Sequence, residues 1–279
     1  MVMPQLWRSV RAPSPDAPLT LSPSAPGLSV QPGFRLQIEA DEAAVAERVA
    51  GVLLEALEVG EPVGLATGRT MEPVYGALRR RVAGWTPERR GRLLVRWCSF
   101  NLDEYVGLGP ADAGSFAAVM AEALGLPLGL AAGQLQLPDG RALDPDAEAR
   151  RYGAAVAAAG GIALQLLGLG SNGHVGFNEP PCPANAPCRC LELSSATRRQ
   201  NAAAFGGDPA AVPARAITLG TAEILAARRV LLVVTGSAKA EILRRSLQEP
   251  PGPEVPASWL QRHPQLQVVV DAAAAAALS

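Results

Sequence analysis

Short apolar runs that end in glycine or a polar residue constrain the fold of this chain more than any other sequence feature. The clearest are PVGLAT at 62–67, GIALQLLGLG at 161–170, ARRVLLVVTG at 227–236 and LQVVVD at 266–271. Runs with an almost unbroken apolar core are typical of strands buried on both faces, and such strands belong to parallel sheets covered by helices. The sequence therefore predicts an α/β fold with a mostly parallel sheet and helices on both of its faces.

Helix-like stretches alternate with these runs, as the crossovers of a parallel sheet require. We expect helices over 41–60, 71–84, 116–124, 144–159, 221–227 and 237–248, and further strands over 34–40, 92–100 and 217–220. Residues 1–33 are rich in Pro and Ser and show neither the apolar period of a helix nor that of a strand. We therefore interpret them as an N-terminal arm that wraps the domain or stays disordered. Residues 34–279 are expected to form a single α/β domain.

Composition and charge exclude several classes of function. The net charge is -1, with both signs interspersed, which argues against nucleic-acid binding and against a basic membrane anchor. No apolar run reaches the roughly 20 residues of a membrane span. The N-terminus lacks the apolar centre of a signal peptide, so we expect a cytoplasmic protein. Cys182, Cys188 and Cys190 offer three thiolates without the fourth ligand that zinc prefers, so no metal site is expected, while a transient redox pair stays open.

Two turns that follow predicted strands are candidates for binding an anion. In Thr67-Gly68-Arg69-Thr70, the N–H groups of a helix N-terminus and the threonine hydroxyls form a suitable pocket, although a plain tight turn explains the glycine equally well. Lys239 lies in the first turn of a predicted helix, where a cation is unfavourable against the helix dipole unless an anion lies nearby. The alternative is a lysine that reaches into solvent.

Asp103 and Glu104 follow the predicted strand 92–100. Neighbours in sequence point in different directions, so the two carboxylates are expected to differ in role. In one alternative they are a loop cap and a solvated charge. In the other, Asp103 is a partly desolvated general base that takes a proton from carbon.

His174 is one of two histidines and lies between two glycines after the run 161–170. One alternative is a structural histidine whose hydrogen bonds are satisfied. The other is a proton shuttle, because glycine lets a ligand approach closely and imidazole titrates near neutral pH. Glu179, five residues later, could orient the imidazole or exchange protons with it.

Taken in order, FNLDEYVGL at 100–108, GHVGFNEP at 173–180 and PASWLQRHPQLQVVVD at 256–271 resemble the glucosamine-6-phosphate deaminase (isomerase) family, a branch of the group that includes 6-phosphogluconolactonases. The resemblance covers about residues 35 to 275, and its FNEP stretch is typical of the deaminases. It implies a Rossmann-like doubly wound sheet, a small-molecule sugar phosphate as the substrate, no metal and no organic cofactor. Family members occur as monomers and as larger rings, so a homo-oligomer stays open.

The resemblance also implies roles in converting glucosamine 6-phosphate to fructose 6-phosphate and ammonia. Asp103 would shuttle a proton between C2 and C1 of the open-chain sugar. His174, supported by Glu179, would help to open the pyranose ring. The loop Thr67, Gly68, Arg69 and Thr70 would hold the phosphate together with Lys239.

Two positions depart from the family's pattern. Asn172 stands where deaminases usually carry an aspartate, and it can hold the imidazole by a hydrogen bond but cannot stabilise an imidazolium by charge, so His174 should be a weaker base. Ala203 stands where the family commonly has an arginine that grips the phosphate. Arg69 could supply that cation instead, since a guanidinium fork suits phosphate, and Arg198 and Arg199 are further candidates.

These departures keep three other functions open. Relatives associated with galactosamine 6-phosphate resemble the asparagine version of the motif, so a galactosamine-6-phosphate deaminase is one. A 6-phosphogluconolactonase is the second, and for it Asp103 would be dispensable. The third is a catalytically weakened sugar-phosphate-binding homologue, which Asn172 and Ala203 favour.

Overall fold

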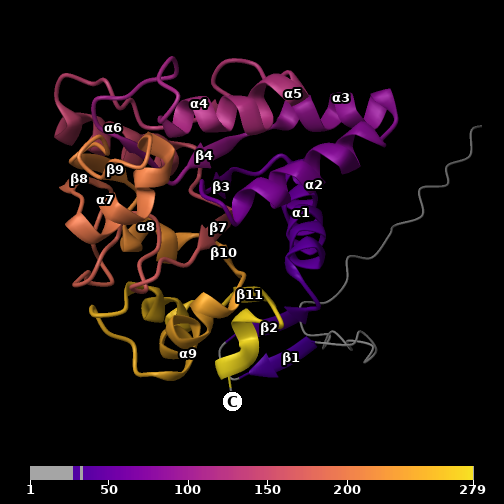
Figure 1. The fold of residues 1–279 in the computed structure, drawn as a ribbon. Helices are drawn as coiled ribbons and strands as arrows, with labels where there is room; N and C mark the ends of the chain where they lie inside the picture. The colour runs from indigo at the N-terminus through magenta and orange to yellow at the C-terminus, as the bar shows by residue number, and fades with distance from the viewer. Residues whose placement is uncertain (1–27, 32–33, 279) are drawn as a thin grey trace, which may run out of the picture.

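The computed structural model describes residues 28–31 and 34–278, which fold around one large sheet (Figure 1). Its strands follow the order β1-β2-β11-β10-β7-β3-β4-β6, and every neighbouring pair except β1 and β2 is parallel. Their bounds are β1 Leu28–Gln31, β2 Phe34–Glu39, β3 Val63–Leu65, β4 Ser99–Asn101, β6 Leu135–Gln136, β7 Leu164–Gly168, β10 Arg229–Val234 and β11 Leu266–Asp271. The predicted α/β fold with a mostly parallel sheet is therefore confirmed.

Helices cover both faces of this sheet. In Figure 1, α1 to α5 lie above and to the right of it, and α6 to α9 lie to the left and below. Their bounds are α1 Glu42–Val59, α2 Met71–Ala83, α3 Pro87–Arg96, α4 Phe116–Met120, α5 Leu126–Leu128, α6 Pro145–Ala158, α7 Ser195–Asn201, α8 Thr221–Ala226 and α9 Ala240–Gln248. A π-helical segment, η1 Ala121–Gly125, joins α4 to α5, and short 3₁₀ segments are η2 Ala202–Phe205, η3 Ser237–Lys239, η4 Pro256–Arg262 and η5 Ala274–Ala277.

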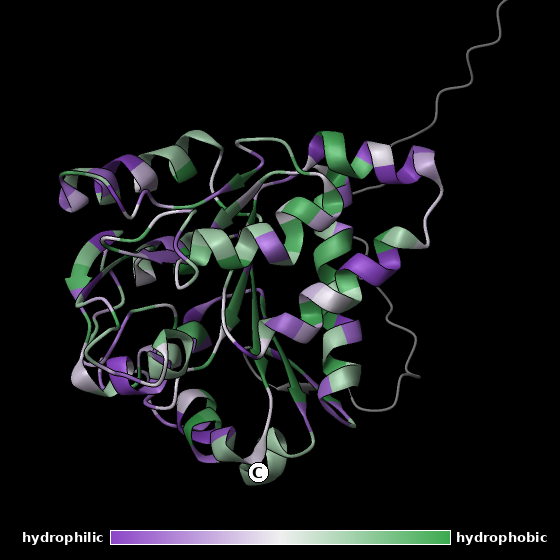
Figure 2. Cartoon of the chain, turned by 45° about the horizontal axis from the view of Figure 1, so that its top comes forward, coloured by the Kyte–Doolittle hydropathy of each residue, from purple (hydrophilic) through white to green (hydrophobic). Residues whose placement is uncertain are grey.

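The apolar runs of the sequence form the centre of the molecule, where the green strands of Figure 2 lie between the helices. In β10, Val230 to Val233 are fully buried, and Val268 to Val270 of β11 are too. Side-chain caps begin two of the predicted helices: the carboxylate of Asp41 accepts from the N–H of Ala44 before α1, and that of Asp144 accepts from Ala147 before α6. Within the described ranges, no helix has both the length and the apolar character needed to cross a bilayer.

The strand predicted over 92–100 is wrong in its first half. Residues 92–96 belong to α3, which begins with Thr86 as its cap and Pro87 in its first turn. The helix buries Leu93 but leaves Val95 83% exposed, so its apolar residues cover a single face. Only Ser99–Asn101 forms the strand β4.

The structure also contains a second sheet that the sequence did not predict, although a strand at 217–220 was expected. It is antiparallel, has the order β5-β9-β8, and consists of β5 Asp103–Tyr105, β9 Arg215–Thr218 and β8 Arg189–Glu192. Of the predicted N-terminal arm, residues 28–31 form β1 at the edge of the large sheet, and the remainder, 1–27 and 32–33, lies outside the described residues.

The order of the large sheet contains one switch point, between β7 and β3. From β3 the chain continues to β4 and β6 on one side, whereas from β7 it continues to β10 and β11 on the other. Loops that leave two adjacent strands in opposite directions open a crevice at the carboxyl ends of those strands, and ligands bind there in sheets of this kind.

Candidate active site

The four sequence motifs meet at this carboxyl edge because they follow four adjacent strands. In the order β10-β7-β3-β4, the strands lead into the loops that carry Lys239, His174, Thr67 and Asp103. The loops also pack on one another: a methyl group on Gly176 would lie 2.9 Å from the Leu102 side chain and 3.0 Å from the hydroxyl of Thr218, which pairs with Asp103. The topology thus brings together residues that are far apart in the sequence.

Asp103 is a buried carboxyl with only 5% of its surface exposed. Among the described residues, no hydrogen bond to its side chain is found. Burial, with a further contribution from the charge of Glu104, raises its pKa to about 8. Burial also raises the pKa of Tyr75 and of Tyr105, and the charge of Asp103 adds to both rises, so two phenols lie within electrostatic reach of the carboxylate. Such a group can exchange a proton near neutral pH.

Glu104 has a structural role. It is 1% exposed, and its carboxylate accepts from the N–H groups of Tyr105, Phe116 and Ala117 at 2.7–2.9 Å. Those donors lie in its own strand and in the first turn of α4, so the side chain ties β5 to the N-terminus of that helix. The sequence argument that these two carboxylates differ in role agrees with their surroundings, and one of them is indeed a cap.

The imidazole of His174 is held by Asn172. The two side chains meet at 2.6 Å between Nδ1 and Oδ1, and the same Oδ1 accepts from the backbone N–H of His174 at 3.2 Å. Because this amide atom accepts from a backbone N–H, it is the oxygen and not the nitrogen of the amide. Nδ1 must therefore donate to it, which leaves Nε2 of the neutral ring unprotonated. The ring lies directly over Gly170, where a Cβ would be 2.3 Å from Nε2.

The expectation that His174 titrates near neutral pH is wrong for the free protein. Burial lowers its pKa to about 4, and the charge of Lys239 lowers it further, while that of Glu179 acts in the opposite direction. Asn172 supplies no negative charge that would offset the burial. At neutral pH the imidazole is therefore uncharged, with a lone pair on Nε2.

Glu179 does not contact the imidazole directly. Its carboxylate accepts from the N–H and hydroxyl of Ser194 at 3.1 and 3.0 Å and from the hydroxyl of Thr197. Ser194 is the cap of α7, so Glu179 lies at the N-terminus of that helix, where a negative charge is favourable. It acts on His174 through its field, since it raises the pKa of the imidazole.

Asn178, which the sequence argument passed over, holds the histidine loop in place. It is fully buried, and its amide group donates to the carbonyls of Val175 and Leu219 at 3.0 and 2.9 Å. Its Oδ1 accepts from Arg189 at 2.8 Å. The only available signal was an asparagine in an otherwise apolar and proline-rich stretch.

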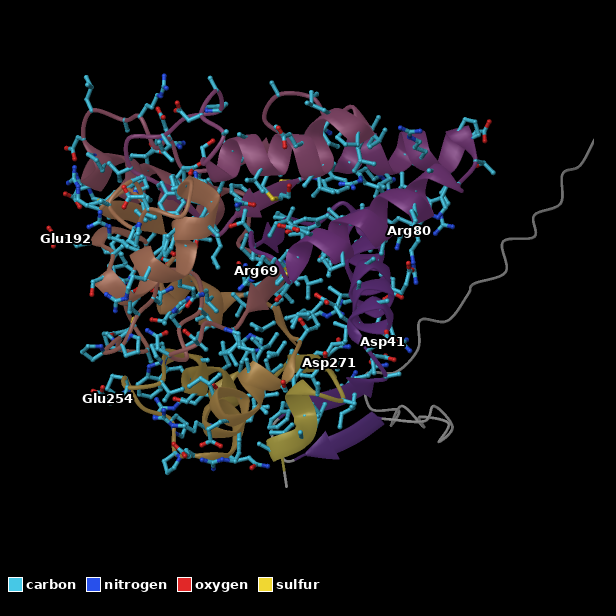
Figure 3. The ribbon with its side chains drawn as sticks, in the orientation of Figure 1. Asp41, Arg69, Arg80, Glu192, Glu254 and Asp271 are labelled. Carbon is cyan, nitrogen blue, oxygen red and sulfur yellow. The ribbon has the colours of Figure 1, made fainter. Side chains whose placement is uncertain are left out.

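Arg69 and Lys239 form a cationic pair at the mouth of this region. Arg69 is exposed and Lys239 half-buried, and neither makes an ion pair within 28–31 and 34–278. Burial lowers the pKa of Lys239, and the charge of Arg69 lowers it further, so the two cations lie within reach of each other. Figure 3 shows Arg69 near the middle of the molecule, whereas Arg80 lies at the periphery. Two adjacent cations without a carboxylate partner favour an anionic ligand.

Backbone geometry adds donors beside Arg69. Gly68 has a φ of 118°, which only glycine adopts freely, and a Cβ at this position would meet nothing within 4 Å. Thr70 precedes α2 without capping it through its side chain, and Thr67 is half-buried. The N-terminus of α2 is thus open towards a ligand that could take up its free N–H groups.

Asp271 positions the loop of Lys239, although the sequence argument did not single it out. Both of its carboxylate oxygens lie 3.0 Å from the N–H of Gly236, and one accepts from Ala274 at 2.7 Å. Gly236 in turn accepts from the N–H of Lys239 at 3.0 Å. Lys239 is also the single lysine among the 25 lysine and arginine residues. Figure 3 shows Asp271 beside the end of β11.

The other candidates of the sequence argument lie elsewhere or are already engaged. Arg198 donates to the carbonyls of Val212 and Ala210 at 3.2 Å each, which leaves Arg199 as the exposed cation of α7. Burial raises the pKa of Cys188 to about 12, so this thiol is not reactive. Residues 28–31 and 34–278 contain no group of three His, Cys, Asp or Glu side chains placed to hold one metal ion.

Comparisons with known proteins agree on one family. Residues 39–270 match the family described as glucosamine-6-phosphate isomerases/6-phosphogluconolactonase. A Rhodopirellula baltica protein named glucosamine-6-phosphate deaminase is 41% identical over 248 residues, which cover 88% of this chain and 96% of that protein. The solved structure of a monomeric glucosamine-6-phosphate deaminase has a TM-score of 0.80 at 31% identity, over 87% of this chain and 99% of the other. A Trypanosoma cruzi 6-phosphogluconolactonase, at 18% identity and a TM-score of 0.69 over 91% and 100%, shares the fold.

Proposed function

The chain belongs to the glucosamine-6-phosphate isomerase/6-phosphogluconolactonase family, and from that premise we propose that it converts glucosamine 6-phosphate and water to fructose 6-phosphate and ammonia. The observation that carries the proposal is Asp103. A buried carboxyl with a pKa of about 8, at the carboxyl edge of the sheet, suits proton transfer between carbon atoms, which is the demanding step of this reaction.

His174 opens the sugar ring. The C2 hydrogen of a cyclic amino sugar becomes acidic only after the ring opens to an aldehyde, which requires moving a proton from the C1 hydroxyl to the ring oxygen. Neutral imidazole with a free Nε2 can accept the first proton and deliver it to the second position. Asn172 keeps Nδ1 protonated and fixes the plane of the ring, and the field of Glu179 stabilises the transient imidazolium.

Asp103 then isomerises the open chain. Its carboxylate takes the proton from C2, which gives an enolamine, and returns it to C1, which gives an imine at C2. Water adds to that imine, and the amine leaves as ammonia, so the atoms balance without an oxidant or a cofactor. Because C1 and C2 are joined in a planar enolamine, one carboxylate above a single face of that plane can serve both transfers.

The phosphate binds between Arg69, Lys239 and the N-terminus of α2. Further hydrogen-bond donors for the phosphate, beside the two cations, are the backbone N–H groups of Thr67, Gly68 and Thr70 and the hydroxyl groups of the two threonines. Ala203 stands where the family commonly has an arginine for the phosphate, and Arg69 supplies that positive charge from another loop. Binding energy from the unreactive phosphate holds C1 and C2 against the catalytic groups.

A galactosamine-6-phosphate deaminase is the second candidate, favoured by Asn172. The two sugars differ only in the configuration at C4, and the same residues would catalyse both reactions. A 6-phosphogluconolactonase fits less well, because hydrolysis of a lactone needs no proton transfer from carbon.

Ammonia and fructose 6-phosphate release from glucosamine 6-phosphate, measured beside galactosamine 6-phosphate and 6-phosphogluconolactone, tests the proposal. We expect glucosamine 6-phosphate to give the highest kcat/KM, and Asp103→Asn to lower its kcat by about 1,000-fold. Preferred turnover of galactosamine 6-phosphate would establish the second candidate. Lactone hydrolysis that is unaffected by Asp103→Asn, or no turnover of any of the three, would refute deamination.

A further inference from the structure

A second cationic site lies at the opposite edge of the large sheet, where β2, β10 and β11 begin. A pocket of about 440 Å³ is lined there by the first residues of these strands and by the segment between η4 and β11. The three strands are neighbours in the order β2-β11-β10 and run parallel, so their starting ends lie together. They are six residues long, which places the pocket roughly 20 Å from the loops of the proposed active site.

Register places two arginines on one face of the sheet. Arg35 and Gln267 are partners across β2 and β11, and Gln267 pairs with Leu231 across β11 and β10. Arg229 lies two positions before Leu231, and residues two apart in a strand share a face. Arg35 and Arg229 therefore flank the start of β11 from both sides and point to the same side of the sheet.

A third arginine reaches the pocket from the segment before β11. The guanidinium of Arg262 lies over the Trp259 ring, 4.5 Å from its centre, and such a cation–π contact occupies none of its N–H donors. The neighbouring His263 has a structural role: Nε2 lies 2.7 Å from the Ala227 carbonyl, and Nδ1 accepts from the N–H of Gln265 at 3.1 Å. These contacts use both ring nitrogens.

Within the described part of the chain, no carboxylate lines the pocket. The described lining residues include Arg35, Arg229 and Arg262 but no Asp or Glu, and none of the three arginines forms an ion pair with another described residue. The adjacent Arg228, in contrast, pairs with Glu61 at 2.8 Å. Three guanidinium groups around one concave site, without an ion-pair partner in the described ranges, match a ligand with several negative charges.

We propose that this pocket binds a small molecule with two or more linked phosphate groups. A guanidinium fork pairs with phosphate oxygens through two parallel hydrogen bonds, and three such cations favour a ligand that carries more negative charge than a single phosphate. The volume lies within the usual range of small-molecule sites. The site is separate from the proposed phosphate site, because the two lie at opposite ends of β10 and β11.

Calorimetric titration with inorganic pyrophosphate tests this proposal. The titrated protein carries Arg69→Gln and Lys239→Gln, which removes the cations of the proposed active site and makes the result independent of the proposed function. We expect one pyrophosphate per chain, an affinity for orthophosphate weaker by about tenfold or more, and a loss of about tenfold when Arg35→Gln and Arg229→Gln are added. Addition of Arg92→Gln and Arg150→Gln, at exposed positions of α3 and α6, removes the same charge as the matched control and should change the affinity less than about twofold.

Three results would overturn the proposal. One is absence of pyrophosphate binding to the background protein. The second is equal affinity with and without Arg35 and Arg229. The third is an equal loss in the control with Arg92→Gln and Arg150→Gln, which would indicate an effect of net charge. Thermal unfolding of each variant verifies that the substitutions leave the fold intact.

Discussion

The imidazole of His174 rests on a glycine, and a single methyl group there should disable it. A Cβ at Gly170 would lie 2.3 Å from Nε2 and Cε1 and 2.4 Å from Cδ2. Non-bonded heavy atoms settle at about 3.5 Å, so Gly170→Ala must push the ring back by about 1.2 Å. That shift also breaks the 2.6 Å contact with Asn172. The backbone tolerates alanine, because Gly170 is not among the glycines with positive φ.

Displacement of a catalytic group by about 1 Å can lower the rate by about 100-fold, so we expect Gly170→Ala to lower kcat with glucosamine 6-phosphate by about that factor. Overpacking should cost only about 1–3 kcal/mol of stability. The measurement is steady-state kinetics with a coupled assay for fructose 6-phosphate, together with thermal unfolding. Gly168→Ala is the control, since its Cβ would meet only the flexible end of Met71 at 3.4 Å, and it should stay within about threefold of wild type.

A double-substitution cycle separates loss of the histidine from general disturbance. If Gly170→Ala acts through the imidazole, it should have little further effect in a His174→Ala background. Equal losses in both backgrounds would refute the assigned role of Gly170, and near-normal activity of Gly170→Ala alone would refute the role of His174 in ring opening.

Three further predictions follow from the site. Asp103→Asn should lower kcat by about 1,000-fold, and a residual rate within tenfold of wild type would contradict its role as the base. The kcat/KM of the wild type should rise with pH through about 8, because burial raises the pKa of this carboxyl and only its ionised form is a base. A flat pH profile from pH 6 to 9 would contradict that assignment. Arg69→Gln should raise KM about tenfold with little change in kcat, whereas the ion-paired Arg80→Gln should leave KM unaltered, and equal kinetics of the two variants would argue against a phosphate contact. Asp271→Ala should raise KM several-fold by releasing Gly236, and Asp271→Asn, which retains one acceptor oxygen, should restore most of it.

Local pattern was sufficient for the central sheet and for the loops that leave it. Runs such as Val230 to Val234 are apolar on both faces, and only a strand between two helical layers can bury them. Residues 92–96 differ from these runs, because their apolar side chains cover one face of a helix that begins at Thr86-Pro87 and do not form the predicted strand. The strands β5 and β8 have no clear local pattern, since short strands of a small antiparallel sheet carry few apolar residues and depend on pairing with β9.

The sequence by itself determined the chemistry of the side chains: a carboxylate, an imidazole and a lone lysine, each after a strand and close to glycine or a turn. Tertiary structure decided what each of them does. Desolvation raises the pKa of Asp103 and lowers that of His174, and it depends on which neighbours the fold packs around each group. Lys239 and Arg69 are far apart in the sequence, so no local preference can bring them together. They become neighbours only because β10, β7, β3 and β4 lie side by side in the sheet.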